Sequence, residues 1–148
     1  MGIKPRLSDE GEMLMKRKQI KRLVIVLGLI LILLIGGRAA LSGIQNNLNT
    51  LSRMNPAMPD LSQVKDGVYL GDYSTFPVSA QVEVTVADHV ITDIRLLKHT
   101  NGQGESAETI LPVVLQAQSI QVDIITGATY SSKVILKAIE LSLLSSLR

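Results

Sequence analysis

The first apolar stretch of the chain, residues 23–37, is also its longest. Leu23–Gly37 carries no charged residue. Its fifteen residues fall short of the roughly 20 that a membrane-spanning helix needs. Arg38 can reach the membrane interface along its aliphatic stem, however, and Ala39–Ile44 continues the apolar stretch. The pattern therefore predicts a transmembrane anchor over residues 23–44.

A group of basic residues stands directly before this run. It consists of Lys16, Arg17, Lys18, Lys21 and Arg22. Because Lys and Arg next to a span remain on the cytoplasmic side, we expect residues 1–22 to be cytoplasmic and the C-terminal domain to be extracytoplasmic. The protein would then be a single-pass protein of the cell membrane. A cleaved signal peptide is the alternative, but Arg38 lies among the small residues of Gly36–Ala40 and no Ala-x-Ala site is present.

A polar segment follows the predicted anchor. Gln45–Gln63 is rich in asparagine, and Asn55–Pro59 contains two prolines that would end a helix. We expect the first half to continue the helix and the whole segment to form a stalk. The predicted organisation is a cytoplasmic N-terminus (1–22), an anchor (23–44), a stalk (45–63) and a domain (64–148).

Two segments of the predicted domain alternate between apolar and polar residues with a period of two. Val82, Val84 and Val86 alternate with polar residues in Ala80–Val86, which predicts a half-buried strand. Val90–Leu97 reads as its hairpin partner, and Asp88-His89 forms the turn between them.

The last third of the chain contains two helical patterns. Pro112 is suited to the first turn of a helix that continues through Val113–Ser119. Ile120–Ile125 predicts a further strand, and about Ser131–Leu147 predicts a C-terminal helix with one apolar face. The expected fold class is α+β: a small, largely antiparallel sheet packed with two helices and preceded by the transmembrane helix.

Composition and charge exclude several function classes. The net charge is only +2, and the basic residues gather at the N-terminus instead of forming a stripe, so we expect no nucleic-acid partner. The chain has no cysteine, which excludes disulfides, thiolate metal sites and iron–sulfur clusters. With only His89 and His99 present, a histidine metal site is not expected. His99 could donate to a bound cofactor or be a solvated residue of the loop before Glu105, and we favour the loop residue. Tyr69 and Tyr73 could border a cofactor ring, and we favour packing residues of a strand.

The most informative motif runs from Asp123 to Ser132. Gly127 and Ala128 remove bulk beside Thr129, and the free backbone N–H groups of a following helix would favour a phosphate. A plain Ser/Thr helix cap is the alternative. The order acidic residue, two spacers, Thr, Gly, Ala, Thr resembles the flavin-attachment motif of the FMN-binding domain family.

This resemblance implies roles for individual residues. Asp123 matches the acidic position, Thr126-Gly127-Ala128 the small turn, and Thr129 the hydroxyl that can be esterified to the phosphate of FMN. In other members of the family FMN is bound without a bond. The Gly102-x-Gly104 element resembles the family's loop against the isoalloxazine ring. Ser131 and Ser132 are expected near the phosphate because they fall at the helix start, and Tyr130, next to Thr129, is either a cofactor contact or a packing residue. It covers Val64–Leu147, and Lys65–Gly71 is similar to the family's opening strand.

The function implied by the resemblance is electron transfer by a membrane-anchored FMN protein. FMN exchanges one or two electrons, and members of the family serve in Rnf-type and sodium-pumping NADH:quinone reductase complexes. The expected partners are the membrane, a flavin transferase that attaches FMN, and membrane redox partners such as quinone-linked donors. The alternative is a regulatory or structural subunit that binds FMN non-covalently. A flavin reductase is disfavoured because no GxGxxG pattern is present.

Overall fold

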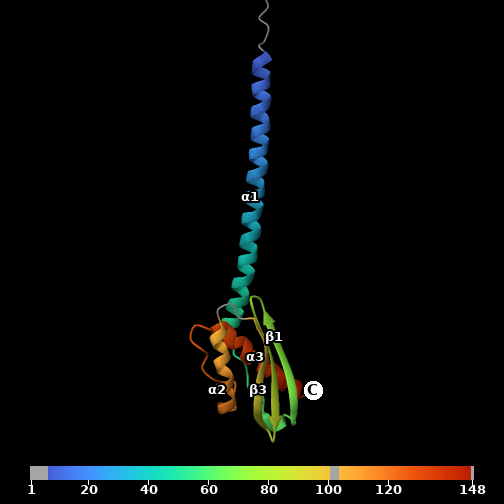
Figure 1. Ribbon diagram of the computed structural model, residues 1–148, viewed down its shortest axis with the longest axis vertical. Coiled ribbons are helices and arrows are strands. Elements are labelled where there is room, and N and C mark those ends of the chain that lie inside the picture. Colours follow the sequence, from blue (N-terminus) through green and yellow to red (C-terminus); the bar gives the residue numbers. More distant parts are fainter. Residues whose placement is uncertain (1–6, 101–103, 148) are drawn as a thin grey trace, which may run out of the picture. The chain divides into compact units, whose positions relative to one another are not determined.

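The computed structural model describes residues 7–100 and 104–147 of the chain. These residues divide into two compact units, residues 1–43 and residues 44–148. The N-terminal unit consists of helix α1 (Leu7–Arg53) up to Gly43, and the helix continues into the second unit (Figure 1). Within α1, residues 15–53 contain a window of mean hydropathy 2.6 with none of it buried. By length and composition, this helix can cross a membrane.

The second unit is an α+β domain, as the sequence predicts. Its sheet has the order β1-β2-β3 and is antiparallel throughout. The strands are β1 (Gly67–Thr75), β2 (Val78–Ala87) and β3 (Val90–Thr100). The helices are the short 3₁₀ turns η1 (Leu61–Gln63) and η2 (Glu105–Thr109), then α2 (Ile110–Ala117) and α3 (Thr129–Ser145).

Strand β2 is the central strand of the sheet, and its residues alternate strictly between buried and half-buried. Every second residue from Val78 to Val86 is buried, and the residues between them are half-buried. Asp88 and His89 both have positive φ, 53° and 63°, which is the geometry of a two-residue hairpin turn. The predicted hairpin is therefore confirmed.

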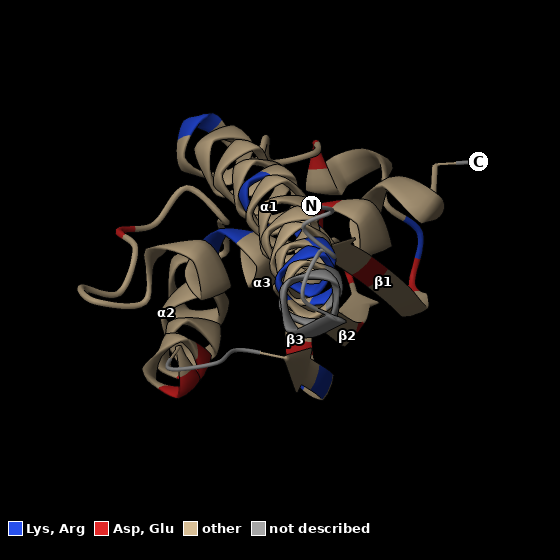
Figure 2. Ribbon diagram, turned by 90° about the horizontal axis from the view of Figure 1, so that it is seen from above, with Lys and Arg blue, Asp and Glu red and all other residues tan. Residues whose placement is uncertain are grey.

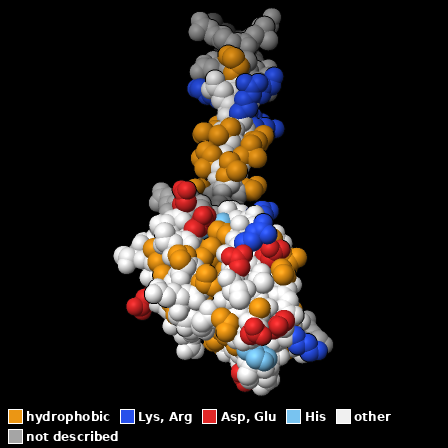
Figure 3. Space-filling model, turned by 60° about the horizontal axis from the view of Figure 1, so that its bottom comes forward, with side chains coloured by type: hydrophobic (Ala, Val, Ile, Leu, Met, Phe, Trp, Pro, Cys, Tyr) orange, Lys and Arg blue, Asp and Glu red, His pale blue; other side chains and the backbone are white. Residues whose placement is uncertain are grey.

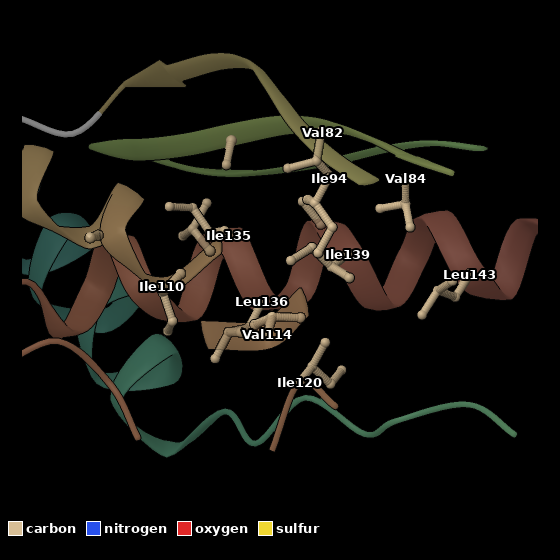
Figure 4. Close-up of a cluster of buried hydrophobic side chains, with 14 of the residues drawn as sticks. Val82, Val84, Ile94, Ile110, Val114, Ile120, Ile135, Leu136, Ile139 and Leu143 are labelled. Carbon is tan, nitrogen blue, oxygen red and sulfur yellow. The ribbon is translucent and has the colours of Figure 1, made fainter. Parts of the chain in front are cut away.

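Helix α3 lies across the inner face of the sheet and forms the middle of the core. It contacts strands β1 and β2 and also the 3₁₀ turn η2. Figure 4 shows Ile135 and Ile139 directed toward Val82 and Ile94 of the sheet, with Val114 and Ile120 beyond α3. All six side chains are buried. The apolar side chains of α3 thus hold the sheet, α2 and the segment after α2 together.

The predicted strand Ile120–Ile125 is wrong. Residues 121–125 have no regular secondary structure and pair with no strand. Gln118, which ends α2 with a φ of 50°, places its side-chain amide on both the N–H and the C=O of Ile91, at 2.8 Å each. The edge of β3 is thereby already occupied at Ile91, and the chain after Gln118 runs on as an irregular segment.

The segment Gln45–Gln63 is helical up to Arg53, and the prolines follow the end of the helix. Leu51 is only 1% exposed and belongs to the core cluster, together with the partly buried Met54 and Met58. The Asn47 side chain also donates to the Phe76 carbonyl at 3.0 Å. The residues suggested as a stalk therefore pack as part of the domain.

Candidate functional site

A tight turn precedes α3 and shapes the candidate site. The Ala128 N–H donates to the Ile125 carbonyl at 3.0 Å, and Gly127 has a φ of +81°. A four-residue turn with positive φ at its third residue is of type II and favours glycine at that position. An added Cβ at Gly127 would meet no atom within 4 Å. The turn therefore leaves open space beside Gly127 itself.

Helix α3 begins at Thr129 without a side-chain cap. Its N-cap is Ala128, with a φ of −126°, and no side chain accepts a hydrogen bond from the first turn. The Ser132 N–H donates to the Ala128 carbonyl at 2.9 Å, so the intrahelical bonds start at Ser132. The N–H groups of the three residues before it are those that a helix start leaves without an intrahelical acceptor. Together with the helix dipole, they favour an anion.

Side chains of the motif divide into two sets by exposure. Asp123, Thr126, Gly127 and Tyr130 are exposed, and Thr129, the first residue of α3, is half-buried. Ala128 is buried at 4% exposure. Asp123, Thr126, Gly127, Thr129 and Tyr130 are thus at least partly accessible, whereas Ala128 between them is not.

Ser131 and Ser132 belong to the other set, because their side chains are 2% and 0% exposed. The Ser132 hydroxyl accepts a hydrogen bond from the Ile125 N–H at 3.2 Å. This bond joins the first helical turn of α3 to Ile125, the first residue of the type II turn. Ser132 therefore stabilises the loop.

The glycine loop that the sequence places near the cofactor is described only in part. Gly102 lies outside the described residues. Gly104 is buried and precedes η2, where its carbonyl accepts the Ala107 N–H at 3.0 Å. Because η2 contacts α3, the described end of this loop lies beside the helix that starts at Thr129.

The interpretation of His99 as a solvated loop residue is wrong. Strand β3 extends to Thr100, and the His99 side chain is 3% exposed on the inner side of the strand. Its Nδ1 lies 2.9 Å from Glu108 Oε1 in η2. The contact ties the end of β3 to η2, on the two sides of the glycine loop.

Lys133 is a residue of the site region that the sequence pattern does not reveal. Its ammonium group donates to the carbonyl oxygens of Ser52 at 2.5 Å and Met54 at 2.7 Å. These are carbonyls at the end of α1, where a helix leaves its last acceptors unpaired. Lys133 stands one helical turn after Thr129, so this contact braces the start of α3. A lysine on a helix surface gives no sequence signal for such a distant partner.

Asp60 caps η1, and the Ser62 hydroxyl and backbone N–H both donate to its carboxylate, which lowers the pKa of that group. Within the described residues, no three His, Asp or Glu side chains are grouped so that they could hold a metal ion.

Comparison with known protein families agrees with this geometry. Residues 78–143 match the model of the FMN-binding domain family, a range that runs from the start of β2 into the end of α3 and includes the whole of Asp123–Ser132. No curated protein matches the chain. The open turn and the uncapped start of α3 fit the phosphate of the cofactor that this family binds. The second unit of the chain therefore carries an FMN-binding domain, and the protein is a flavoprotein with FMN as its cofactor.

Proposed function

We propose that the protein is a membrane-anchored, extracytoplasmic electron carrier in which FMN is esterified to Thr129. The observation that carries the proposal is the position of Thr129, the first residue of α3, between the open Gly127 turn and an uncapped helix start. A phosphate bonded to this hydroxyl would lie beside the N–H groups of the first turn, which stabilise its negative charge.

Neighbouring hydroxyl groups are less suited to carry the cofactor. Ser131 and Ser132 are buried, and the Ser132 hydroxyl is engaged with Ile125. Thr126 is exposed and is the main rival, but it lies before the Gly127 turn and outside the helix. Its phosphate ester would lack the support of the helix start.

Formation of the ester requires an activated flavin nucleotide, which a flavin transferase would supply. The Thr129 hydroxyl gives up its proton, and its oxygen forms a bond to the flavin phosphorus as the leaving group departs from that phosphorus. The net gain is FMN less one water. The exposed Asp123 carboxylate, which precedes the turn in the sequence, would take part in the attachment.

The role in electron transfer follows from the cofactor and from the anchor. FMN supplies the exchange of one or two electrons, and the protein supplies its position. The chain has no GxGxxG pattern for a nicotinamide, so we infer that electrons come from a membrane redox partner such as a quinone-linked donor. Five basic residues before the apolar run support a cytoplasmic N-terminus and an exterior FMN domain.

The attachment is tested by intact mass and by in-gel flavin fluorescence after co-expression with a flavin transferase. Wild type should gain the mass of FMN less water and stay fluorescent after denaturation. Thr129→Ala should lose the adduct and keep the fold, and Thr129→Ser should retain at least part of it. Thr126→Ala is the matched control and should be labelled like wild type.

Two outcomes would change the proposal. Denaturation-resistant flavin on Thr129→Ala would overturn the assignment of the acceptor. Flavin that leaves wild type on denaturation would establish non-covalent binding, as expected of a regulatory or structural FMN subunit.

The orientation is tested by single-cysteine labelling, which is clean because the chain has no cysteine of its own. In cells without an outer barrier, an impermeant maleimide should label Ser74→Cys at once and Gln19→Cys only after permeabilisation. Both residues are exposed. The reverse pattern would show that the domain faces the cytoplasm.

A further inference from the structure

The basic residues at the start of the apolar run form a collar around helix α1. We define the basic collar as Lys16, Arg17, Lys18, Lys21 and Arg22, which are all exposed. At about 100° per residue, they are spread over roughly two thirds of the helix circumference. Figure 3 shows these blue side chains directly next to the orange side chains of the apolar run. A collar of this kind presents cations in several directions at one level of the helix.

A shallow groove on the same helix connects the collar to the apolar run. It is lined by Lys16, Gln19, Ile20 and Leu23, which share one face because they are spaced three and four residues apart. Along about 10 Å of helix, the lining changes from a cation and an amide to two apolar side chains. This is the order in which a phospholipid presents its phosphate and then its acyl chain.

We propose that the basic collar and its groove bind anionic phospholipid headgroups of the leaflet in which α1 begins its span. The proposal rests on the membrane anchor of the proposed function. Charge complementarity supports a lipid, since clusters of four to eight Lys and Arg beside a span attract anionic headgroups. A protein partner that bound this helix would contact only one face of it, whereas lipids surround the helix.

Three acidic residues precede the collar in the sequence. Asp9, Glu10 and Glu12 stand before Lys16 in the sequence, whereas the apolar run begins after Arg22. The residues next to Leu23 are Lys21 and Arg22, so the cations stand closest to the headgroup level. Nucleic acid would also be attracted to such a cluster, and it is treated as a competing outcome below.

The experiment measures which lipids contact the full-length protein after reconstitution into phosphatidylcholine bilayers. Spin-labelled phosphatidylglycerol or phosphatidylcholine is added, and the motionally restricted fraction gives the relative association of the two lipids. We expect at least about a fivefold preference for the anionic lipid at low salt, equivalent to one full cationic contact. It should fall toward one in about 1 M salt, where the screening length is only about 3 Å.

Variants assign the preference to the collar. The triple change Lys16→Gln, Lys18→Gln and Lys21→Gln should reduce the preference toward one. The charge-conserving triple change to Arg at these positions should retain it. Lys98→Gln removes an exposed charge from the domain and should leave it unchanged.

Alkaline extraction in parallel separates this inference from the anchor itself. Protein that stays integrated but associates equally with both lipids would overturn the inference alone. A preference that survives the glutamine variant, or that a short RNA abolishes at low concentration while the lipid is in excess, would overturn it too. Wild type that is extracted from the bilayer would overturn the anchor, and this inference with it.

Discussion

At Gly71 strand β1 comes very close to the backbone of helix α3, and this position provides a sharp test of the packing. A Cβ added at Gly71 would lie 2.8 Å from the backbone nitrogen and the Cβ of Ser142. It would come even closer to the Ala138 carbonyl oxygen, inside any allowed contact distance. Gly71→Ala therefore forces the backbone of α3 away from β1.

The cost should be at the upper end of what an added methyl group causes. Overpacked cores lose about 1–3 kcal/mol, and more where the neighbours cannot yield. Here the neighbours are helix backbone, and α3 is held by the fully buried Ile135 and Ile139. We expect a loss of about 3 kcal/mol or more, which lowers Tm by at least roughly 12 °C for a domain of this size.

Tyrosine fluorescence reports this unfolding without interference from the apolar helix. The chain has three tyrosines and no tryptophan, and Tyr69 and Tyr73 lie in β1 on either side of Gly71. Val68→Ala, on the exposed face of β1, is the control and should stay within about 0.5 kcal/mol of wild type. Ser142→Gly should not rescue Gly71→Ala, because the Ala138 carbonyl remains. A Gly71→Ala domain that melts within about 3 °C of wild type would refute the close packing of β1 on α3.

Three further predictions concern contacts far apart in the sequence. Leu51→Ala should destabilise the domain by about 2–5 kcal/mol in urea unfolding, because it opens a cavity in the core, whereas Leu41→Ala on exposed helix should not. Gln118→Ala should cost about 1–3 kcal/mol and speed amide exchange at Ile91, which loses its side-chain partner; unchanged exchange would contradict the edge role of Gln118. Lys133→Met should release the end of α1 and accelerate tryptic cleavage after Arg53, and equal cleavage in variant and wild type would show that the contact is not formed in solution.

Periodicity along the chain was sufficient to predict strands β2 and β3 and the last helix. In β2, one valine at every second position implies one buried face, and the structure buries that face. The observed α3 starts two residues before the predicted Ser131, because the turn at Gly127 closes at Ala128. Local patterns are reliable here since the same residues that define the pattern form the core.

The absence of a strand after α2 could not be predicted from the local sequence pattern. Ile120–Ile125 has the composition of a strand, but a strand also needs a free edge with which to pair. Gln118 bonds the backbone of Ile91, and the N–H groups of Gln121 and Ile125 are satisfied by the hydroxyls of Ser119 and Ser132. Side chains thus replace the backbone ladder, which a pattern of apolar residues does not encode.

Contacts between distant segments were equally hidden. Leu51 reads as part of a polar stalk, yet it is a core residue, and Lys133 reads as a surface lysine, yet it binds the end of α1. His99 shows the same limit, since its burial depends on how far β3 extends and on Glu108 of η2. The motif at Thr129 was recognisable because turn, acceptor and helix start are consecutive in the chain.

The central place of α3 also determines when the domain can fold. During synthesis, α3 follows the strands that it covers, after β3, η2 and α2 have already been made. Until α3 emerges, the buried face of β2 lacks the helix that covers it, and contacts between distant segments form slowly. An exported chain would therefore cross the membrane unfolded and complete its sheet only on the far side. Thr129 would acquire its helix start, and with it a place for a flavin phosphate, only in the compartment where folding ends.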